Sequence, residues 1–300
     1  MRWDDFRRSD NVEDDREGGG GFGLPIHPGG IGIGTMVVLG IIGWAFGINP
    51  FYLIQGAEML NRGGSSYEQP YERTARNTGA PRDKTGDFVA AVLGNTEDVW
   101  GQVFRERNAT YRPPRLRLYS GSERGGCGFA QAAMGPFYCP TDQRIYLDTS
   151  FFRDMQVRFR GCSGKACEFA EAYVVAHEVG HHVQNLLGVL PKARDAQAAA
   201  GSRAGANRIQ VRVELQADCL AGFWANRSNQ KWKTLEPGDV AAALQTASAI
   251  GDDRLQKQTR GYVVPDAFTH GSSAQRQRWF STGLKEGTVA ACNTFAAAQL

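Results

Sequence analysis

Residues 170–185 have the sequence AEAYVVAHEVGHHVQN, and the rest of the chain is interpreted from this stretch. No proline interrupts it and its apolar residues recur at helical spacing, which predicts a buried helix from about Glu168 to Leu187. His177 and His181 are four residues apart, so both imidazoles lie on one helix face, where they can bind a single metal ion. Glu178 is then placed to act as general base for a water on the metal's open side.

The pattern His-Glu-x-x-His is rare by chance. With five histidines and fourteen glutamates in 300 residues, a shuffled chain would contain it roughly 0.003 times. In the alternative, the histidines only form hydrogen bonds with one another in a core. A sequence with a single histidine would favour such a purely structural role more than this pattern does. His182 directly follows His181 and points about 100° away from it, so we interpret it as a packing residue or a residue that supports a ligand, and not as a ligand itself.

A second predicted helix, residues 207–225 (NRIQVRVELQADCLAGFWA), supplies a third ligand. Glu214 and Asp218 are four residues apart among apolar neighbours, and buried carboxylates are costly unless they are paired or bind metal. We therefore predict Glu214 as the third zinc ligand. Asp218 would accept a hydrogen bond from a liganding imidazole, that of His177, and fix its tautomer. In the alternative, the two carboxylates form surface ion pairs with Arg208 and Arg212.

HEVGHHVQ at 177–184 followed by ELQADCLAG at 214–222 resembles the bacterial neutral zinc metallopeptidase family, whose ligation is of the gluzincin type. The resemblance covers most of the chain, including MRWDDFRRSDNVED at the start, GPFYCPTDQRIYLDTSFF at 135–152 and VPDAFTHGSSAQRQRWF at 264–280. It implies an α+β fold: a mainly helical, zincin-like metallopeptidase domain with a small β-sheet. It also implies one zinc ion bound by His177, His181 and Glu214, with Glu178 as catalytic base.

Residues 269–276 (THGSSAQR) resemble the T-H-P-x-x-x-x-R block of the CAAX-prenyl-protease-like membrane metallopeptidases, with Gly271 in place of proline. His270 or Arg276 would then stabilise the oxyanion that forms when water attacks a peptide carbonyl. In the alternative, this stretch starts a helix and His270 is a satisfied surface or core residue. Tyr262 is a weaker candidate for the oxyanion role.

Composition fits one medium domain with appendages, because 42% of the residues are hydrophobic and 22% are charged. The net charge of +3 and the scattered basic residues do not indicate a nucleic-acid partner. Residues 1–30 are predicted to be a charged and then Gly-rich tail, with 1–17 mobile.

The segment 31–54 is apolar, and no Asp, Glu, Lys or Arg occurs between Glu17 and Glu58, which predicts one transmembrane anchor in a lipid bilayer. Its glycines and Pro50 weaken the signal; a buried core helix and a cleaved signal peptide are the alternatives. Residues 55–86 are predicted to be a polar linker, and 87–300 the zinc metallopeptidase domain.

Within that domain, Thr96 is expected to cap a helix that runs through Arg107. Residues 114–120 predict a strand, 137–148 a hairpin, and 239–250 an Ala-rich helix behind the site. By analogy with thermolysin-like enzymes, Arg144–Asp148 would be an edge strand that pairs with an extended substrate; an ordinary sheet strand is the alternative.

Six cysteines allow fifteen pairings. The shortest loops favour Cys127–Cys139 and Cys162–Cys167, which leaves Cys219–Cys292. Disulfides indicate an oxidising compartment, hence a catalytic domain on the periplasmic side of the bacterial inner membrane; reduced cysteines in a cytoplasmic domain are the alternative.

The function expected from these features is hydrolysis of peptide bonds in a peptide or protein substrate, by a zinc-activated water and a glutamate base. One alternative is a catalytically silent, zinc-stabilised binding or assembly module, but a structural zinc site has no need of Glu178. Another is hydrolysis of a different amide, such as a cell-wall crosslink, which the ligands alone do not distinguish from peptide cleavage.

Overall fold

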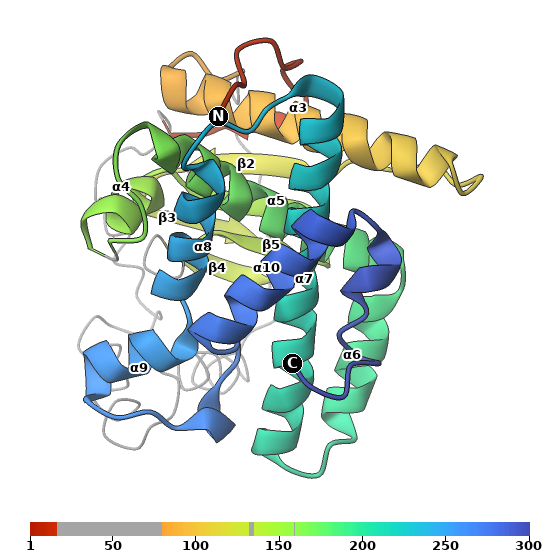
Figure 1. Ribbon diagram of the computed structural model, residues 1–300, viewed down its shortest axis with the longest axis vertical. Helices are drawn as coiled ribbons and strands as arrows, with labels where there is room; N and C mark the ends of the chain where they lie inside the picture. Colours follow the sequence, from red (N-terminus) through yellow and green to blue (C-terminus); the bar gives the residue numbers. More distant parts are fainter. Residues whose placement is uncertain (17–79, 132–134, 159) are drawn as a thin grey trace, which may run out of the picture. The chain divides into compact units, whose positions relative to one another are not determined.

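The computed structural model describes residues 1–16, 80–131, 135–158 and 160–300. Helices account for most of these residues, and a small mixed sheet accompanies them (Figure 1), so the α+β prediction is confirmed. The expected anchor 31–54 lies outside the described residues, as do the Gly-rich segment and most of the linker. Of the helices in the described ranges, none is long and apolar enough to cross a membrane.

Two of the three longest described helices carry the expected metal-binding motifs. In chain order the helices are α3 (Lys84–Arg105), α4 (Ser150–Val157), α5 (Cys167–Leu186), α6 (Val189–Ala198), α7 (Arg203–Trp232), α8 (Asp239–Ala249), α9 (Asp252–Arg260) and α10 (Ser273–Glu286), with 3-10 turns η2 (Gly164–Ala166), η3 (Pro265–Ala267) and η4 (Val289–Cys292). Helices α5, α7 and α8 confirm the helices predicted at 168–187, 207–225 and 239–250.

The predicted cap at Thr96 is wrong, because Thr96 lies inside α3 and its hydroxyl donates to the Leu93 carbonyl. The actual N-cap is Asp83, whose carboxylate accepts the Gly86 N–H at 2.7 Å.

The main sheet has the order β1 (Val12–Asp14), β2 (Arg115–Tyr119), β6 (Arg144–Asp148), β5 (Phe137–Cys139). Strands β1 and β6 pair parallel with β2, and β5 pairs antiparallel with β6, which confirms the predicted strand and hairpin. A separate hairpin joins β3 (Ser122–Gly125) and β4 (Gly128–Gln131). The prediction that β6 is a free edge is wrong, because β2 and β5 occupy both of its sides. In the described part of the sheet the edges are β1, which packs against α3, and β5, which packs against α5.

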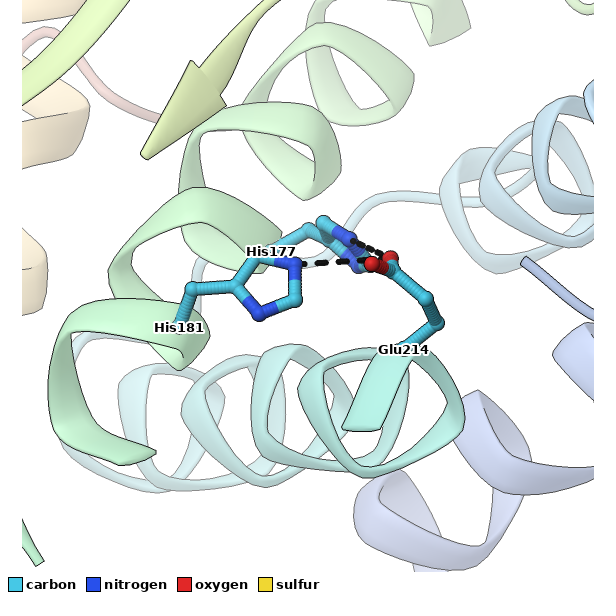
Figure 2. Close-up of side chains that lie close together, drawn as sticks. All are labelled: His177, His181 and Glu214. Atoms are coloured by element: carbon cyan, nitrogen blue, oxygen red, sulfur yellow. Dashed lines mark hydrogen bonds and ion pairs between the residues drawn. The ribbon is translucent and has the colours of Figure 1, made fainter. Parts of the chain in front are cut away.

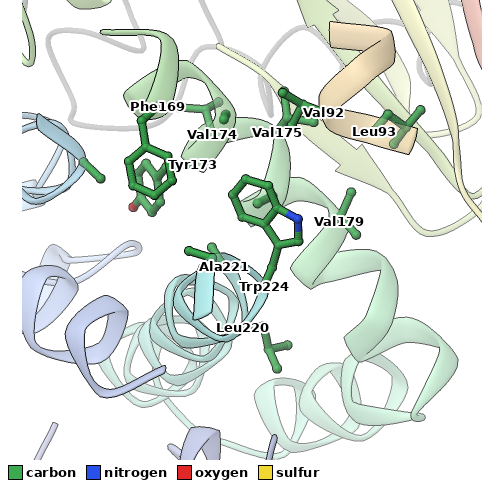
Figure 3. Close-up of a cluster of buried hydrophobic side chains, with 14 of the residues drawn as sticks. Val92, Leu93, Phe169, Tyr173, Val174, Val175, Val179, Leu220, Ala221 and Trp224 are labelled. Carbon is green, nitrogen blue, oxygen red and sulfur yellow. The ribbon is translucent and has the colours of Figure 1, made fainter. Parts of the chain in front are cut away.

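The core forms where α5, α7 and α3 meet (Figure 3). Val175 and Val179 of α5 and Trp224 of α7 are 1% exposed or less. The indole N–H of Trp224 donates to the Asn95 side-chain carbonyl at 2.9 Å, which joins α7 to α3. Burial of apolar surface on this scale is the main favourable contribution to folding, about 25 cal/mol per Å² removed from water.

The first sixteen residues pack on this core, so the prediction of a mobile tail is wrong for them. Trp3 and Phe6 are each 6% exposed, and the Trp3 ring meets Phe88 of α3 edge-on at 5.2 Å. Arg7 donates to the Glu97 carboxylate at 2.7 Å. The segment is ordered because its few apolar side chains pack against the core and its charged side chains form ion pairs with residues of α3.

All six cysteines form disulfides in the predicted pairs, namely Cys127–Cys139, Cys162–Cys167 and Cys219–Cys292. The last bond joins the middle of α7 to η4, and so returns the C-terminal segment to the helix that carries Glu214.

Helices α7 and α10 pack at glycine positions, which brings their backbones close. A Cβ added to Gly283 would overlap the Cys219 carbonyl oxygen, and one added to Gly222 would overlap the Phe280 carbonyl oxygen. Both obstacles are main-chain atoms that cannot move without displacing a helix.

We predict that Gly283→Ala lowers the free energy of unfolding by about 1–3 kcal/mol, because the added methyl group forces α10 away from α7. Gly101→Ala is the control: it lies inside α3, where only the flexible end of Arg105 stands near the added atom, at 3.3 Å. That change should leave stability unaltered or raise it by about 0.5–1 kcal/mol. Urea denaturation measures both, and equal midpoints for Gly283→Ala and wild type would contradict the packing argument.

His182 is fully buried on the side of α5 that faces β5 and is a packing residue, as expected. Its Nε2–H donates to the Arg112 carbonyl at 2.6 Å, and its Nδ1 accepts from the Tyr138 hydroxyl, 3.1 Å away. The hydroxyl is free to donate because it accepts from Asn185. Burial lowers the pKa of His182 to about 4, against a smaller opposing effect of the Arg112 carbonyl.

This shift predicts acid sensitivity between pH 6.5 and about 4. In that window the unfolded chain binds a proton at His182 that the native state does not, so stability falls as pH falls, by up to about 1.4 kcal/mol per pH unit. His182→Gln removes this titration. The difference in unfolding free energy between wild type and variant, measured from pH 7 to 4, should therefore narrow towards low pH; a constant difference would refute the neutral buried histidine.

Candidate metal centre

Helices α5 and α7 bring the three predicted ligands together (Figure 2). The ligand atoms of His177, His181 and Glu214 all lie within 4.8 Å of one another. Glu214 Oε2 is 3.3 Å from His177 Nε2 and 3.4 Å from His181 Nε2. In the described ranges this is the one group of three such side chains close enough to hold a metal ion.

The hydrogen-bond partners of the two Nδ1 atoms show which ring nitrogen of each histidine carries the proton. His177 Nδ1 lies 2.9 Å from Asp218 Oδ1, and an ionised carboxylate only accepts, so Nδ1 carries the proton. His181 Nδ1 lies 2.8 Å from Gln184 Oε1. The amide nitrogen of Gln184 donates to the Val213 carbonyl, so its oxygen faces His181 and accepts. Each neutral imidazole therefore presents an Nε2 lone pair to Glu214.

Three lone-pair-bearing atoms facing one another repel unless a cation lies among them. Two imidazole nitrogens and one carboxylate oxygen form a donor set typical of catalytic zinc, which keeps a further position for water. Burial lowers the pKa of His177, but Asp218 and Glu214 outweigh it and raise that pKa to about 10. In metal-free protein a proton would thus neutralise the site, and a metal ion must displace it. The residues present fit zinc.

Glu178 lies beside His177 and is 6% exposed. It lines the same cleft as the three ligands, a space of about 490 Å³. Within the part of the chain that the structure describes, no hydrogen bond occupies its carboxylate. It is therefore available to accept a hydrogen bond from a water in the cleft.

Asp218 is fully buried and holds His177 from behind, as expected. Burial raises its pKa, but Arg276 and His177 outweigh burial and keep that pKa well below its usual range. Arg276 donates through Nε to Asp218 Oδ2 at 2.8 Å and through Nη2 to Asp218 Oδ1 at 2.9 Å. The Tyr173 hydroxyl donates to Asp218 Oδ1 at 2.6 Å.

These contacts change the interpretation of Arg276. Only 3% exposed, its guanidinium is engaged with Asp218 and Tyr173, so the geometry favours a role in holding Asp218 over the expected contact with an oxyanion. Tyr173 was missed by the sequence argument. Its signal was its spacing, since it precedes His177 by four residues and shares its helix face.

The structure around His270 has features of both alternatives, namely the start of a helix and a histidine at the site. Ser272 caps α10 through a capping box with Gln275, as the alternative expected. His270 nevertheless lines the cleft, with its side chain 51% exposed and Nδ1 3.3 Å from Asp252 Oδ1. Burial lowers its pKa, but Asp252 and then Glu214 raise it overall. Tyr262 is 62% exposed and does not line the cleft, so the geometry gives it no oxyanion role.

The cleft has walls of different character. Its lining beside β5 and α4 is mainly apolar and aromatic. The wall on α6 adds two apolar and two polar side chains, Leu190, Ala193, Arg194 and Gln197.

Comparisons with known proteins agree with this geometry. The model of the family described as "Putative neutral zinc metallopeptidase" matches residues 1–295. Uncharacterized protein YpfJ of Escherichia coli (strain K12) is 44% identical over 302 residues, 98% of this chain and 99% of YpfJ. Uncharacterized protein Rv2575 of Mycobacterium tuberculosis (strain H37Rv) is 46% identical over 233 residues, 74% of this chain and 75% of Rv2575.

No solved structure matches the chain. The family match runs from the packed N-terminal segment through both metal-site helices to the disulfide on η4. The chain therefore belongs to the family of "putative neutral zinc metallopeptidases".

Proposed function

We propose that this protein is a zinc-dependent metallopeptidase that hydrolyses peptide bonds, with His177, His181 and Glu214 as ligands and Glu178 as general base. The observation that carries the proposal is the convergence of two imidazole nitrogens and one carboxylate oxygen in a cleft, beside the Glu178 carboxylate, to which no other described residue donates a hydrogen bond. A purely structural site has no use for that additional carboxylate or for the cleft.

Zinc held there would act as a Lewis acid and lower the pKa of a water from about 15.7 towards 7. Glu178 takes the proton of the attacking water and delivers it to the leaving amine. Asp218 keeps His177 in the tautomer whose Nε2 faces the site. His270, held at the cleft by Asp252, is the candidate donor to the developing oxyanion.

Strand β5 is the element best placed to bind an extended substrate. It is the sheet edge beside α5, and Phe137 and Tyr138 line the cleft. An edge strand offers unpaired backbone groups that can pair with a peptide in extended conformation. We therefore assign to β5 the substrate-binding role that was expected for β6.

The proposed location is the bacterial inner membrane, with one anchor at residues 31–54 and the catalytic domain in the periplasm. Two features support this proposal: the apolar composition of 31–54, and the three disulfides, which persist in oxidising compartments.

Glu178→Gln in the full-length chain tests the proposed base. We expect wild type and variant to hold one zinc per chain, and the variant to cleave a casein-type substrate about 10²–10⁴-fold more slowly, because the amide cannot accept the water's proton. Glu171→Gln is a matched control: it is the same change on the same helix, but Glu171 does not line the cleft. It should keep wild-type activity.

The outcomes separate the rival functions. Undiminished cleavage by Glu178→Gln would refute its role as base. Zinc in wild type without cleavage of casein, but with cleavage of peptidoglycan crosslinks, would replace the peptide substrate by another amide. Zinc with neither activity would favour a binding module, and well-folded protein that binds no zinc would refute the metal site.

Removal of the metal should lower the thermal midpoint, because an ion that binds only the native state stabilises it by about 4 kcal/mol at a thousand times its Kd. Differential scanning fluorimetry with and without a chelator measures this shift, and added zinc should reverse it. His181→Ala should abolish the response to chelator; a chelator effect of the same size in that variant would mean that the ion is bound elsewhere.

A further inference from the structure

Two glutamines form a chain of hydrogen bonds that ends on the third ligand. Gln197 of α6 donates through Nε2 to Gln210 Oε1 of α7 at 2.8 Å. Gln210 in turn donates through Nε2 to Glu214 Oε1, also at 2.8 Å. Gln210 precedes Glu214 by four residues, so the two side chains lie on one helix face.

The two oxygens of the Glu214 carboxylate therefore have different partners. Oε1 accepts the hydrogen bond from Gln210, whereas Oε2 faces the Nε2 atoms of His177 and His181 (Figure 2). The carboxylate cannot turn about its own axis without breaking the bond to Gln210. Gln210 thus fixes the orientation of the carboxylate at Oε1, the oxygen other than the one that faces the histidines.

That orientation matters because a carboxylate can bind a metal ion through one oxygen or through both. A catalytic zinc site has three protein donors and keeps a further position for water. If Oε1 also became a donor, it would compete with water for that position. A hydrogen bond that occupies Oε1 opposes this second mode.

Gln197 supports the orientation of the Gln210 amide in which the NH2 group faces the Glu214 carboxylate. Because the Gln197 NH2 group donates to the Gln210 oxygen, the Gln210 nitrogen is left to donate to the carboxylate. The reverse orientation would set the amide oxygen against an anionic oxygen and the two NH2 groups against each other. Both glutamines also line the cleft, so its α6 wall is connected to the ligand.

We propose that Gln210 is a positioning residue that keeps Glu214 a one-oxygen ligand, and that Gln197 acts through it by orienting its amide. This inference rests on the proposed zinc site, since a carboxylate without a metal has no coordination mode to select. It adds to the proposed function a reason why the position for water stays open.

The test replaces Gln210 by Met in the full-length chain, which keeps the length of the side chain and removes its donor. Cobalt(II) is the probe ion, because its visible absorption is stronger in four-coordinate than in five-coordinate sites. We expect Gln210→Met to bind cobalt but to absorb more weakly than wild type. In the zinc-loaded variant kcat should fall about 10–100-fold, the usual range for loss of a hydrogen bond to a ligand, with KM nearly unchanged.

Gln230→Met is the matched control. Gln230 lies on the same helix and donates to Asn226 four residues before it, at 2.9 Å, but does not line the cleft. Its spectrum and kcat should equal those of wild type. Gln197→Met should shift both in the same direction as Gln210→Met, by a smaller amount.

A wild-type spectrum and kcat in Gln210→Met would overturn this inference and leave the proposed function standing, provided that wild type binds cobalt and cleaves substrate. If wild type itself takes up no cobalt or zinc, the metal site fails and the inference fails with it. An altered spectrum with an equal loss in Gln230→Met would also overturn it, because the effect would then belong to the helix and not to Gln210.

Discussion

The close approach of α5 and α7 is the constraint on which the rest of the structure depends. A Cβ added to Gly180 would stand 3.1 Å from the Ala217 carbonyl oxygen and 3.2 Å from its Cα, so the two backbones are close enough that even a methyl group there would be crowded. Gly180 directly precedes His181, and Ala217 directly precedes Asp218. The distance between the helices therefore sets the distance between the imidazoles and the carboxylates that face them.

Once the helices are that close, polar groups must be matched in a confined interior. Each ligand has one atom directed at the common centre and another bound to a neighbour: Asp218 holds His177, Gln184 holds His181 and Gln210 holds Glu214. Buried polar atoms that are paired cost far less than unpaired ones. The outer hydrogen bonds thus hold the three ligand side chains in place for the ion.

The sequence was most informative where the chemistry is local to one helix. Spacings of four residues placed His177 with His181 and Glu214 with Asp218, because helical geometry alone decides which side chains share a face. The pairing of the cysteines was also predicted, since short loops restrict the choice. Zinc as the metal followed from the donor set, and the family match agrees with it.

Other features depend on contacts between segments that are far apart in the sequence. For these features, composition and local pattern led to wrong predictions. Residues 1–16 are highly charged, but their partners, such as Glu97, lie far along the sequence on α3, 88 residues from Ser9. The sequence of strand β6 fits an edge position as well as an interior one, and only its pairing with β2 distinguishes the two. Arg276 was placed near the site by resemblance, whereas its contact with Asp218 depends on how α10 packs against α7.

The bond between Cys219 and Cys292 has a consequence for the motions of the site. It closes a loop of 73 residues that contains α8, α9 and α10, and therefore His270 and Arg276. In a chain-entropy model such a closure disfavours the unfolded state by about 4 kcal/mol. If α9 or α10 opens transiently to admit a bulky substrate, the segment remains tethered beside α7. Reclosure is then an intramolecular step, so the segment that carries His270 and Arg276 stays near the site.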